Sequence, residues 1–139
     1  MPLLASSLMV ASAAILLFLG SVHLLYTFRG TKLHPRDPAL RERMEAVSPG
    51  LTRQTTMWKA WIGFNASHSA SAMLFGLVYG HLAIVQAPVL FGSPFLLGLG
   101  AVFLAGFVVL GKKYWFSIPY RGLVLATACY AGALLAAIS

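Results

Sequence analysis

Four long stretches of apolar residues make up most of the chain. A polar loop at 29–56, a short uncharged turn at 86–90 and a basic, aromatic turn at 111–118 separate them. The stretches cover residues 3–28, 57–85, 91–110 and 119–138. The hydrocarbon core of a bilayer is about 30 Å thick, and a helix needs about 20 apolar residues to cross it. Hydrocarbon offers the backbone no hydrogen-bond partner, so each stretch must close its hydrogen bonds within a helix. The pattern therefore predicts an all-α fold, an integral membrane antiparallel four-helix bundle that forms one domain over residues 1–139.

The first polar segment carries the pattern of a short helix. Asp37 followed by Pro38 is typical of an N-cap with proline at the first helical position. Apolar residues then recur at helical spacing on one face, at Leu40, Met44 and Val47. Charged residues occupy the other faces, and the run Ser48-Pro49-Gly50 ends the pattern. We expect a short amphipathic interfacial helix with its apolar side toward the membrane.

The distribution of charge gives this bundle an orientation. The chain has 10 Lys and Arg against 3 Asp and Glu, a net charge of +7. All ten basic residues lie within residues 29–59 or 112–121. The positive-inside rule then places loops 29–56 and 111–118 in the cytoplasm and both termini outside. The charge is thus a topology signal, and because no recognition motif accompanies it, we expect membrane lipids and no nucleic acid as partners.

The same charges exclude several kinds of chemistry. All three carboxylates lie within residues 37–45, outside the apolar stretches, so a buried carboxylate relay or paired-carboxylate hydrolysis is excluded. The single cysteine, Cys129, excludes an intrachain disulfide framework and a multi-cysteine metal site. We expect His34 and His81, near the ends of the stretches, to be solvated. The residues therefore favour a non-catalytic role.

Polar residues inside the apolar stretches are the remaining candidates for a site. Helical rise places them in the cytoplasmic half of the bilayer on three of the four helices. An unpaired amide or imidazole in hydrocarbon is costly, so we expect these side chains to face inward and bond one another. The pocket candidates are His23, Tyr26, Asn65, His68, Thr127 and Tyr130. We expect a second set at the headgroup level, namely Trp58, Trp61, Lys112, Lys113 and Arg121.

Three interpretations of the pocket candidates stay open. They can hold the helices together, bind a lipid, quinone or other small apolar molecule, or ligate haem or a metal through His23 and His68. No cofactor or metal is predicted. Haem or quinone is the alternative to the absence of a cofactor. The favoured function is a non-catalytic membrane protein that binds a lipid-like or quinone-like molecule or serves as accessory subunit of a larger complex or homo-oligomer. The alternative is an intramembrane haem-binding redox or lipid-modifying protein.

Three segments carry a family resemblance. They read TTMWKAWIGFNASHS over 55–69, GSVHLLYTF over 20–28 and KKYWFSIPYRG over 112–122. Together they resemble an uncharacterised family of small four-span bacterial membrane proteins. The resemblance implies a bacterial membrane location and a single four-helix unit, and we expect this membrane to be the inner membrane. It brings no assigned activity, so it assigns no catalytic residue.

Overall fold

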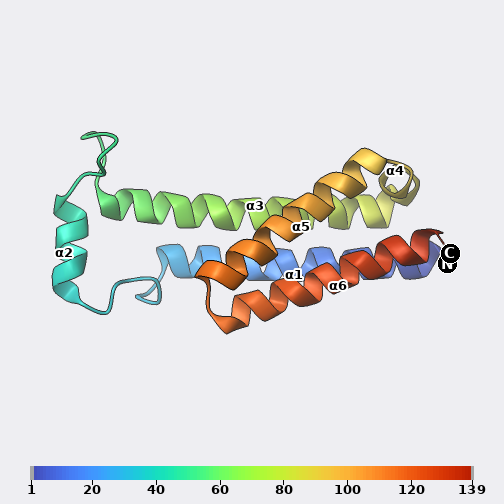
Figure 1. Ribbon diagram of the computed structural model, residues 1–139, viewed down its shortest axis with the longest axis horizontal. Helices are drawn as coiled ribbons and strands as arrows, with labels where there is room; N and C mark the ends of the chain where they lie inside the picture. Colours follow the sequence, from blue (N-terminus) through green and yellow to red (C-terminus); the bar gives the residue numbers. More distant parts are fainter. Residues whose placement is uncertain (1, 139) are drawn as a thin grey trace. The chain divides into compact units, whose positions relative to one another are not determined.

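The computed structural model describes residues 2–138, and its regular structure is helical throughout this range. The helices are α1 (Pro2–Phe28), α2 (Pro38–Ala46), α3 (Met57–Val85), α4 (Ala87–Phe91), α5 (Pro94–Tyr114) and α6 (Ser117–Ile138) (Figure 1). Four of them, α1, α3, α5 and α6, are long and apolar enough to cross a membrane. The expected all-α fold of four membrane-length helices, with a short helix between the first two, is confirmed.

Two compact units divide the chain, and α1 and α3 contribute a segment to each. The first unit combines the chain up to Leu19 with the chain from Ala72 onwards. It therefore holds segments of all four long helices. The second unit is Gly20–Ser71, which holds the end of α1, the whole of α2 and the start of α3.

The start of the third long helix differs from the expected boundary at residue 91. Residues 87–91 form the separate helix α4, where we expected a turn. Helix α5 begins at Pro94, because the hydroxyl of Ser93 accepts the backbone N–H of Leu96 at 3.3 Å and caps the helix. It continues to Tyr114, so the two lysines of the third connection lie in its last turn.

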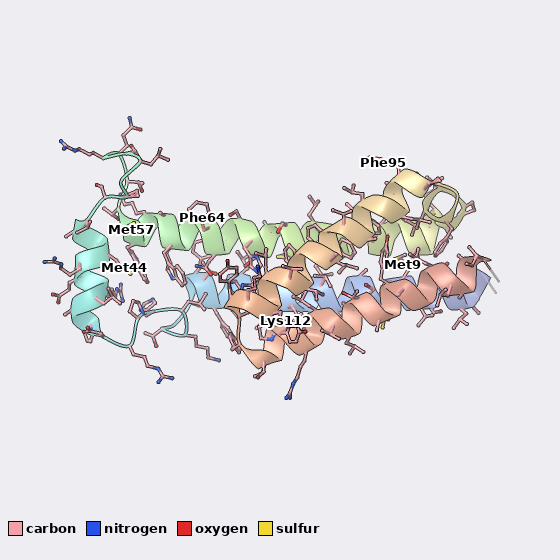
Figure 2. All side chains as sticks on the ribbon, viewed as in Figure 1. Met9, Met44, Met57, Phe64, Phe95 and Lys112 are labelled. Carbon is pink, nitrogen blue, oxygen red and sulfur yellow. The ribbon has the colours of Figure 1, made fainter. Side chains whose placement is uncertain are left out.

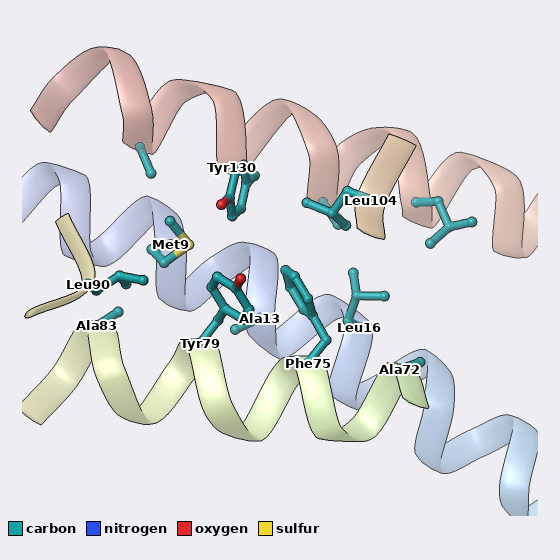
Figure 3. Close-up of a cluster of buried hydrophobic side chains, with 13 residues drawn as sticks. Met9, Ala13, Leu16, Ala72, Phe75, Tyr79, Ala83, Leu90, Leu104 and Tyr130 are labelled. Carbon is teal, nitrogen blue, oxygen red and sulfur yellow. The ribbon is translucent and has the colours of Figure 1, made fainter. Parts of the chain in front are cut away.

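The core of the first unit is built from aliphatic side chains around a group of aromatic rings. Figure 3 shows these side chains converging from the long helices and α4. Helices α5 and α6 pack against each other as a hairpin. Helices α1 and α3 approach closely at Gly76, which is buried against the backbone of Ala13 and Leu17. The largest fully buried aliphatic side chains are Met9, Leu16, Leu90, Leu104 and Leu123.

Large apolar side chains also cover the outside of the long helices (Figure 2). Phe64 on α3 is 76% exposed and Phe95 on α5 is 73% exposed. Water would make such exposure unfavourable, whereas lipid chains solvate these side chains. The length of the helices and the apolar character of their outer faces define a small multi-pass membrane protein.

The second unit is held together by contacts of its loops. The Asp37 side chain accepts the backbone N–H of Ala39 at 2.9 Å and caps α2, as the sequence predicts. Helix α2 ends at Ala46, and the backbone N–H of Met57 donates to the carbonyl of Val47 at 2.8 Å. These bonds anchor α2 to the start of α3. Helix α2 has no buried residue, and on its apolar face Leu40 and Val47 are about half exposed.

Candidate functional site

Three of the pocket candidates meet in the second unit, and we call them the histidine–asparagine cluster: His23 on α1, and Asn65 and His68 on α3. The ring Nε2 of His23 lies 2.9 Å from Oδ1 of Asn65. The rings of His23 and His68 meet edge to face, with centroids 5.3 Å apart. All three side chains are half-buried. Their meeting follows from antiparallel helices that carry polar residues at similar depth.

The hydrogen bonds of Asn65 indicate which ring nitrogen of His23 carries a proton. The amide Nδ2 of Asn65 donates to the carbonyl of Trp61 at 2.8 Å, which leaves Oδ1 as the atom that faces His23. A carbonyl oxygen only accepts, so Nε2 of His23 carries the proton. In the neutral ring, Nδ1 is then an acceptor. The cluster therefore holds a donor–acceptor pair and one imidazole nitrogen that can accept a further hydrogen bond.

Neighbouring hydroxyl groups are bonded within their own helices. The hydroxyl of Thr27 donates to the carbonyl of His23 at 2.8 Å, and that of Ser69 donates to the carbonyl of Asn65 at 2.9 Å. Ser71 bonds the carbonyl of His68 in the same way, at 2.8 Å. Such bonds satisfy a hydroxyl in an apolar setting without a partner from another helix. The distinctive chemistry of the region therefore belongs to the imidazoles and the amide.

Thr127 and Tyr130 belong to the first unit, and their hydroxyl groups already have acceptors there. Thr127 donates to the carbonyl of Leu123 on its own helix at 2.8 Å. Tyr130, which is 2% exposed, donates to the carbonyl of Leu97 on α5 at 2.7 Å. The two side chains stabilise α6 and its contact with α5.

Sequence reasoning missed Tyr79 as a partner of α5. Its hydroxyl donates to the carbonyl of Leu96 at 2.6 Å, one residue before the carbonyl that Tyr130 uses. The ring of Tyr79 stacks on Phe75 with centroids 4.3 Å apart, and Phe75 stacks on Phe103 at 5.0 Å. The third span, which carries none of the pocket candidates, was expected to offer no polar partner. Its backbone carbonyls are in fact the acceptors, and no side-chain pattern in the sequence marks them.

The two tryptophans expected at the headgroup level contact the first loop. The indole N–H of Trp61 donates to the carbonyl of Leu33 at 3.1 Å. The ring of Trp58 meets His34 edge to face at 5.0 Å and carries the guanidinium of Arg41 at 4.8 Å. The expectation of a solvated His34 is wrong, because its ring is half-buried between these groups and its Nδ1 accepts from Arg41 at 2.8 Å.

The remaining predicted interface residues are exposed side chains at helix ends. Lys112 and Lys113 occupy the last turn of α5, and Arg121 lies near the start of α6. Figure 2 shows the position of Lys112 on α5. Cations in the last turn of a helix interact favourably with its dipole. Contact of the three with lipid headgroups stays a prediction. The last of the predicted residues, Tyr26, lines a hollow described below.

The histidine–asparagine cluster can bind a polar group, but it offers few ligands to a metal. Within residues 2–138, no group of three His, Cys, Asp or Glu side chains is placed to hold an ion. One nitrogen of His23 is engaged by Asn65. A haem iron between two axial imidazoles would require the rings to move apart by the thickness of the macrocycle. Hydrogen bonding therefore describes this geometry better than ligation.

Comparison of the chain with family models, with curated proteins and with solved structures gives no match. The resemblance to a four-span bacterial family stays a prediction.

Proposed function

We propose that the protein is a non-catalytic membrane protein that binds a lipid-like or quinone-like molecule at the histidine–asparagine cluster. The observation that carries the proposal is the half-buried His23–Asn65 pair beside His68, inside helices of membrane-spanning length. A partly open polar group within hydrocarbon is stabilised by any partner that brings a hydrogen bond. A small apolar molecule with one hydroxyl or carbonyl group has that chemistry.

The hydrogen-bonding capacity of His23 limits the chemical class of the ligand. With Nε2 donating to Asn65, Nδ1 of the neutral ring would accept a hydrogen bond, so it suits a hydroxyl donor such as that of a quinol or a glycerol hydroxyl. The exposed apolar side chain of Phe64, which neighbours Asn65 on α3, would contact the apolar body of the ligand. Hydrogen bonding would then fix one end of the ligand while lipid-like packing holds the rest.

Native purification in a mild detergent, with mass spectrometry of co-purifying lipids and quinones, tests this function. Asn65→Leu and His68→Phe should each lose a molecule that the wild type retains. His81→Phe is the matched control, because His81 is an exposed histidine on the same helix. Identical extracts from all three variants and the wild type would assign the cluster to helix packing alone. Subunits that co-purify with the wild type would support the accessory role in a larger complex.

For the alternative, a haem protein, the favourable observation is that His23 and His68 are adjacent. A Soret band in the purified or haem-reconstituted wild type, lost in His68→Phe, would replace ligand binding by haem ligation as the function. We expect no such band, because His23 is engaged by Asn65.

We infer an orientation in a bacterial inner membrane with both termini outside. The support is the placement of all ten basic residues within 29–59 and 112–121. Helix α2, with its half-exposed apolar face, would then lie in the cytoplasmic headgroup layer. Reporter fusions at the C-terminus and in the loop at residue 53 should report opposite sides. A cytoplasmic C-terminus would overturn the orientation.

A further inference from the structure

A hollow opens where α1 ends and the first loop begins. It has a volume of about 480 Å³ and lies entirely in the second unit. Its lining residues are Leu25, Tyr26, Arg29, Gly30, Thr31 and Lys32. The wall thus combines an aliphatic side chain, an aromatic ring, a hydroxyl group and two cations. This set differs from the histidine–asparagine cluster, which carries no permanent charge.

The local backbone explains why these residues face one space. The N–H of Arg29 still bonds the carbonyl of Leu25 at 2.8 Å, so α1 keeps its helical path up to that point. Gly30 then has φ of +79°, a left-handed conformation that glycine adopts without strain. The chain reverses there and brings Thr31 and Lys32 beside the last turn of α1. Glycine therefore favours the turn that forms the hollow.

The cations of the hollow have no carboxylate partner among residues 2–138. Of the three acidic side chains in that range, Glu45 pairs with Arg41, Asp37 caps α2, and Glu42 forms no ion pair with either cation. The ammonium of Lys32 lies 4.0 Å from the centroid of the Tyr26 ring, which holds it at the rim of the hollow. Two cations beside a hydroxyl and without a counter-ion form a local positive potential that attracts an anion.

The position of the hollow along α1 points to the source of that anion. The apolar span of α1 ends at Phe28, and Leu25 and Phe28 are both exposed. Arg29 follows immediately, so the hollow lies at the border between the apolar span and the basic loop. Lipid phosphates occupy this border in a bilayer, and cations near an anionic surface bind it electrostatically.

We propose that this hollow binds a phosphate group, carried by an anionic phospholipid. Arg29 and Lys32 would contact the phosphate, Thr31 would donate its hydroxyl, and Leu25 with the Tyr26 ring would contact the glycerol and the start of the acyl chains. The proposal is independent of ligand binding at the histidine–asparagine cluster, so Asn65→Leu should leave it unchanged.

Native mass spectrometry of the full-length protein in detergent tests the proposal. Phosphatidylglycerol and phosphatidylcholine are titrated separately, and the wild type should retain phosphatidylglycerol in preference. The variant Arg29→Gln/Lys32→Gln should lose about fivefold in affinity per cation, or about 25-fold in all. The control Arg36→Gln/Arg53→Gln removes the same charge from exposed loop positions and should change affinity less than about twofold, because solvent and salt screen it.

The remaining variants and a competition experiment distinguish a specific phosphate site from a general effect of positive charge. Arg29→Lys/Lys32→Arg should keep binding, which shows that a folded hollow with two cations suffices. Equal losses in the two glutamine variants, or no loss in either, would overturn the proposal. Displacement of bound phosphatidylglycerol by millimolar inorganic phosphate would overturn the assignment to a lipid and identify a soluble phosphate site.

Discussion

Replacing Gly76 by alanine should destabilise the bundle, because α1 and α3 leave no room for a methyl group there. A Cβ at this position would lie 2.7 Å from the carbonyl oxygen of Ala13, 2.7 Å from Cβ of Leu17 and 2.9 Å from its backbone nitrogen. Carbon atoms in contact prefer a separation of about 3.5–4.0 Å. Two of the three atoms belong to the backbone, so side-chain rotation cannot relieve the overlap and the helices must move apart.

The size of the effect follows from two opposing contributions. Overpacking a close contact costs about 1–3 kcal/mol, and a backbone contact such as that of Gly76 lies at the upper end. Alanine also favours the helix by about 1 kcal/mol over glycine. We therefore expect the free energy of unfolding to fall by about 2 kcal/mol, a rise of about 30-fold in the ratio of unfolded to folded protein.

Unfolding by SDS in mixed micelles, followed by far-UV circular dichroism, measures this difference. Gly80→Ala, one turn further along α3, places its Cβ 3.5 Å from that of Ala13 and should have little effect. Gly98→Ala meets nothing within 4 Å and should be neutral or slightly stabilising. Equal destabilisation by Gly76→Ala and Gly98→Ala would refute the reasoning. A change of oligomeric state alone in Gly76→Ala would show that the glycine contacts another protomer.

The same assay checks four further substitutions. Tyr79→Phe and Tyr130→Phe each remove a hydroxyl that donates to a carbonyl of α5. Each should lower the free energy of unfolding by about 0.6–1.7 kcal/mol. An unchanged free energy of unfolding would contradict these hydrogen bonds. Ser12→Ala should be neutral or stabilise the protein by up to about 1 kcal/mol, because the buried Ser12 hydroxyl has no partner among residues 2–138. Its removal therefore leaves no polar group unsatisfied. A clear destabilisation would show that the hydroxyl forms a hydrogen bond. Gly30→Ala should cost about 1–2 kcal/mol through backbone strain alone, since the new Cβ would meet no atom within 4 Å, and it should also weaken phosphatidylglycerol binding.

The long helices could be predicted from the sequence because membrane insertion depends on length and charge, which are local properties. The predicted ends of 57–85 coincide with those of α3. Helix α5 begins three residues after the predicted start at residue 91, because a count of apolar residues includes Phe91 in the span. The Ser93 cap and Pro94 mark the start of α5, and a count of apolar residues takes neither of them into account.

The candidate site was predictable only where helical rise alone brings side chains together. His23 and Asn65 lie at similar depths on antiparallel helices, and the cost of an unpaired polar group in hydrocarbon favours turning both side chains inward, so their contact could be predicted. The bond of Tyr130 to Leu97 depends on the register and rotation of α5 against α6. Backbone carbonyls carry no sequence signature, so the acceptors for Tyr130 and Tyr79 could not be read from residue types.

The glycines show most clearly why a pattern of small residues does not by itself define a contact. At Gly76 the missing side chain lets two backbones approach, whereas at Gly100 a Cβ would lie 2.8 Å from the ring of Tyr79 and 2.9 Å from Cζ of Tyr130. Gly100 therefore makes room for the tyrosines that bond α5 rather than for another helix. Gly98 and Gly106 on the same helix meet nothing within 4 Å. The residue type is identical at all four positions, so the neighbouring atoms alone decide which glycine the bundle requires. Substitution by alanine should destabilise the protein at Gly76 and Gly100 and have little effect at Gly98 and Gly106.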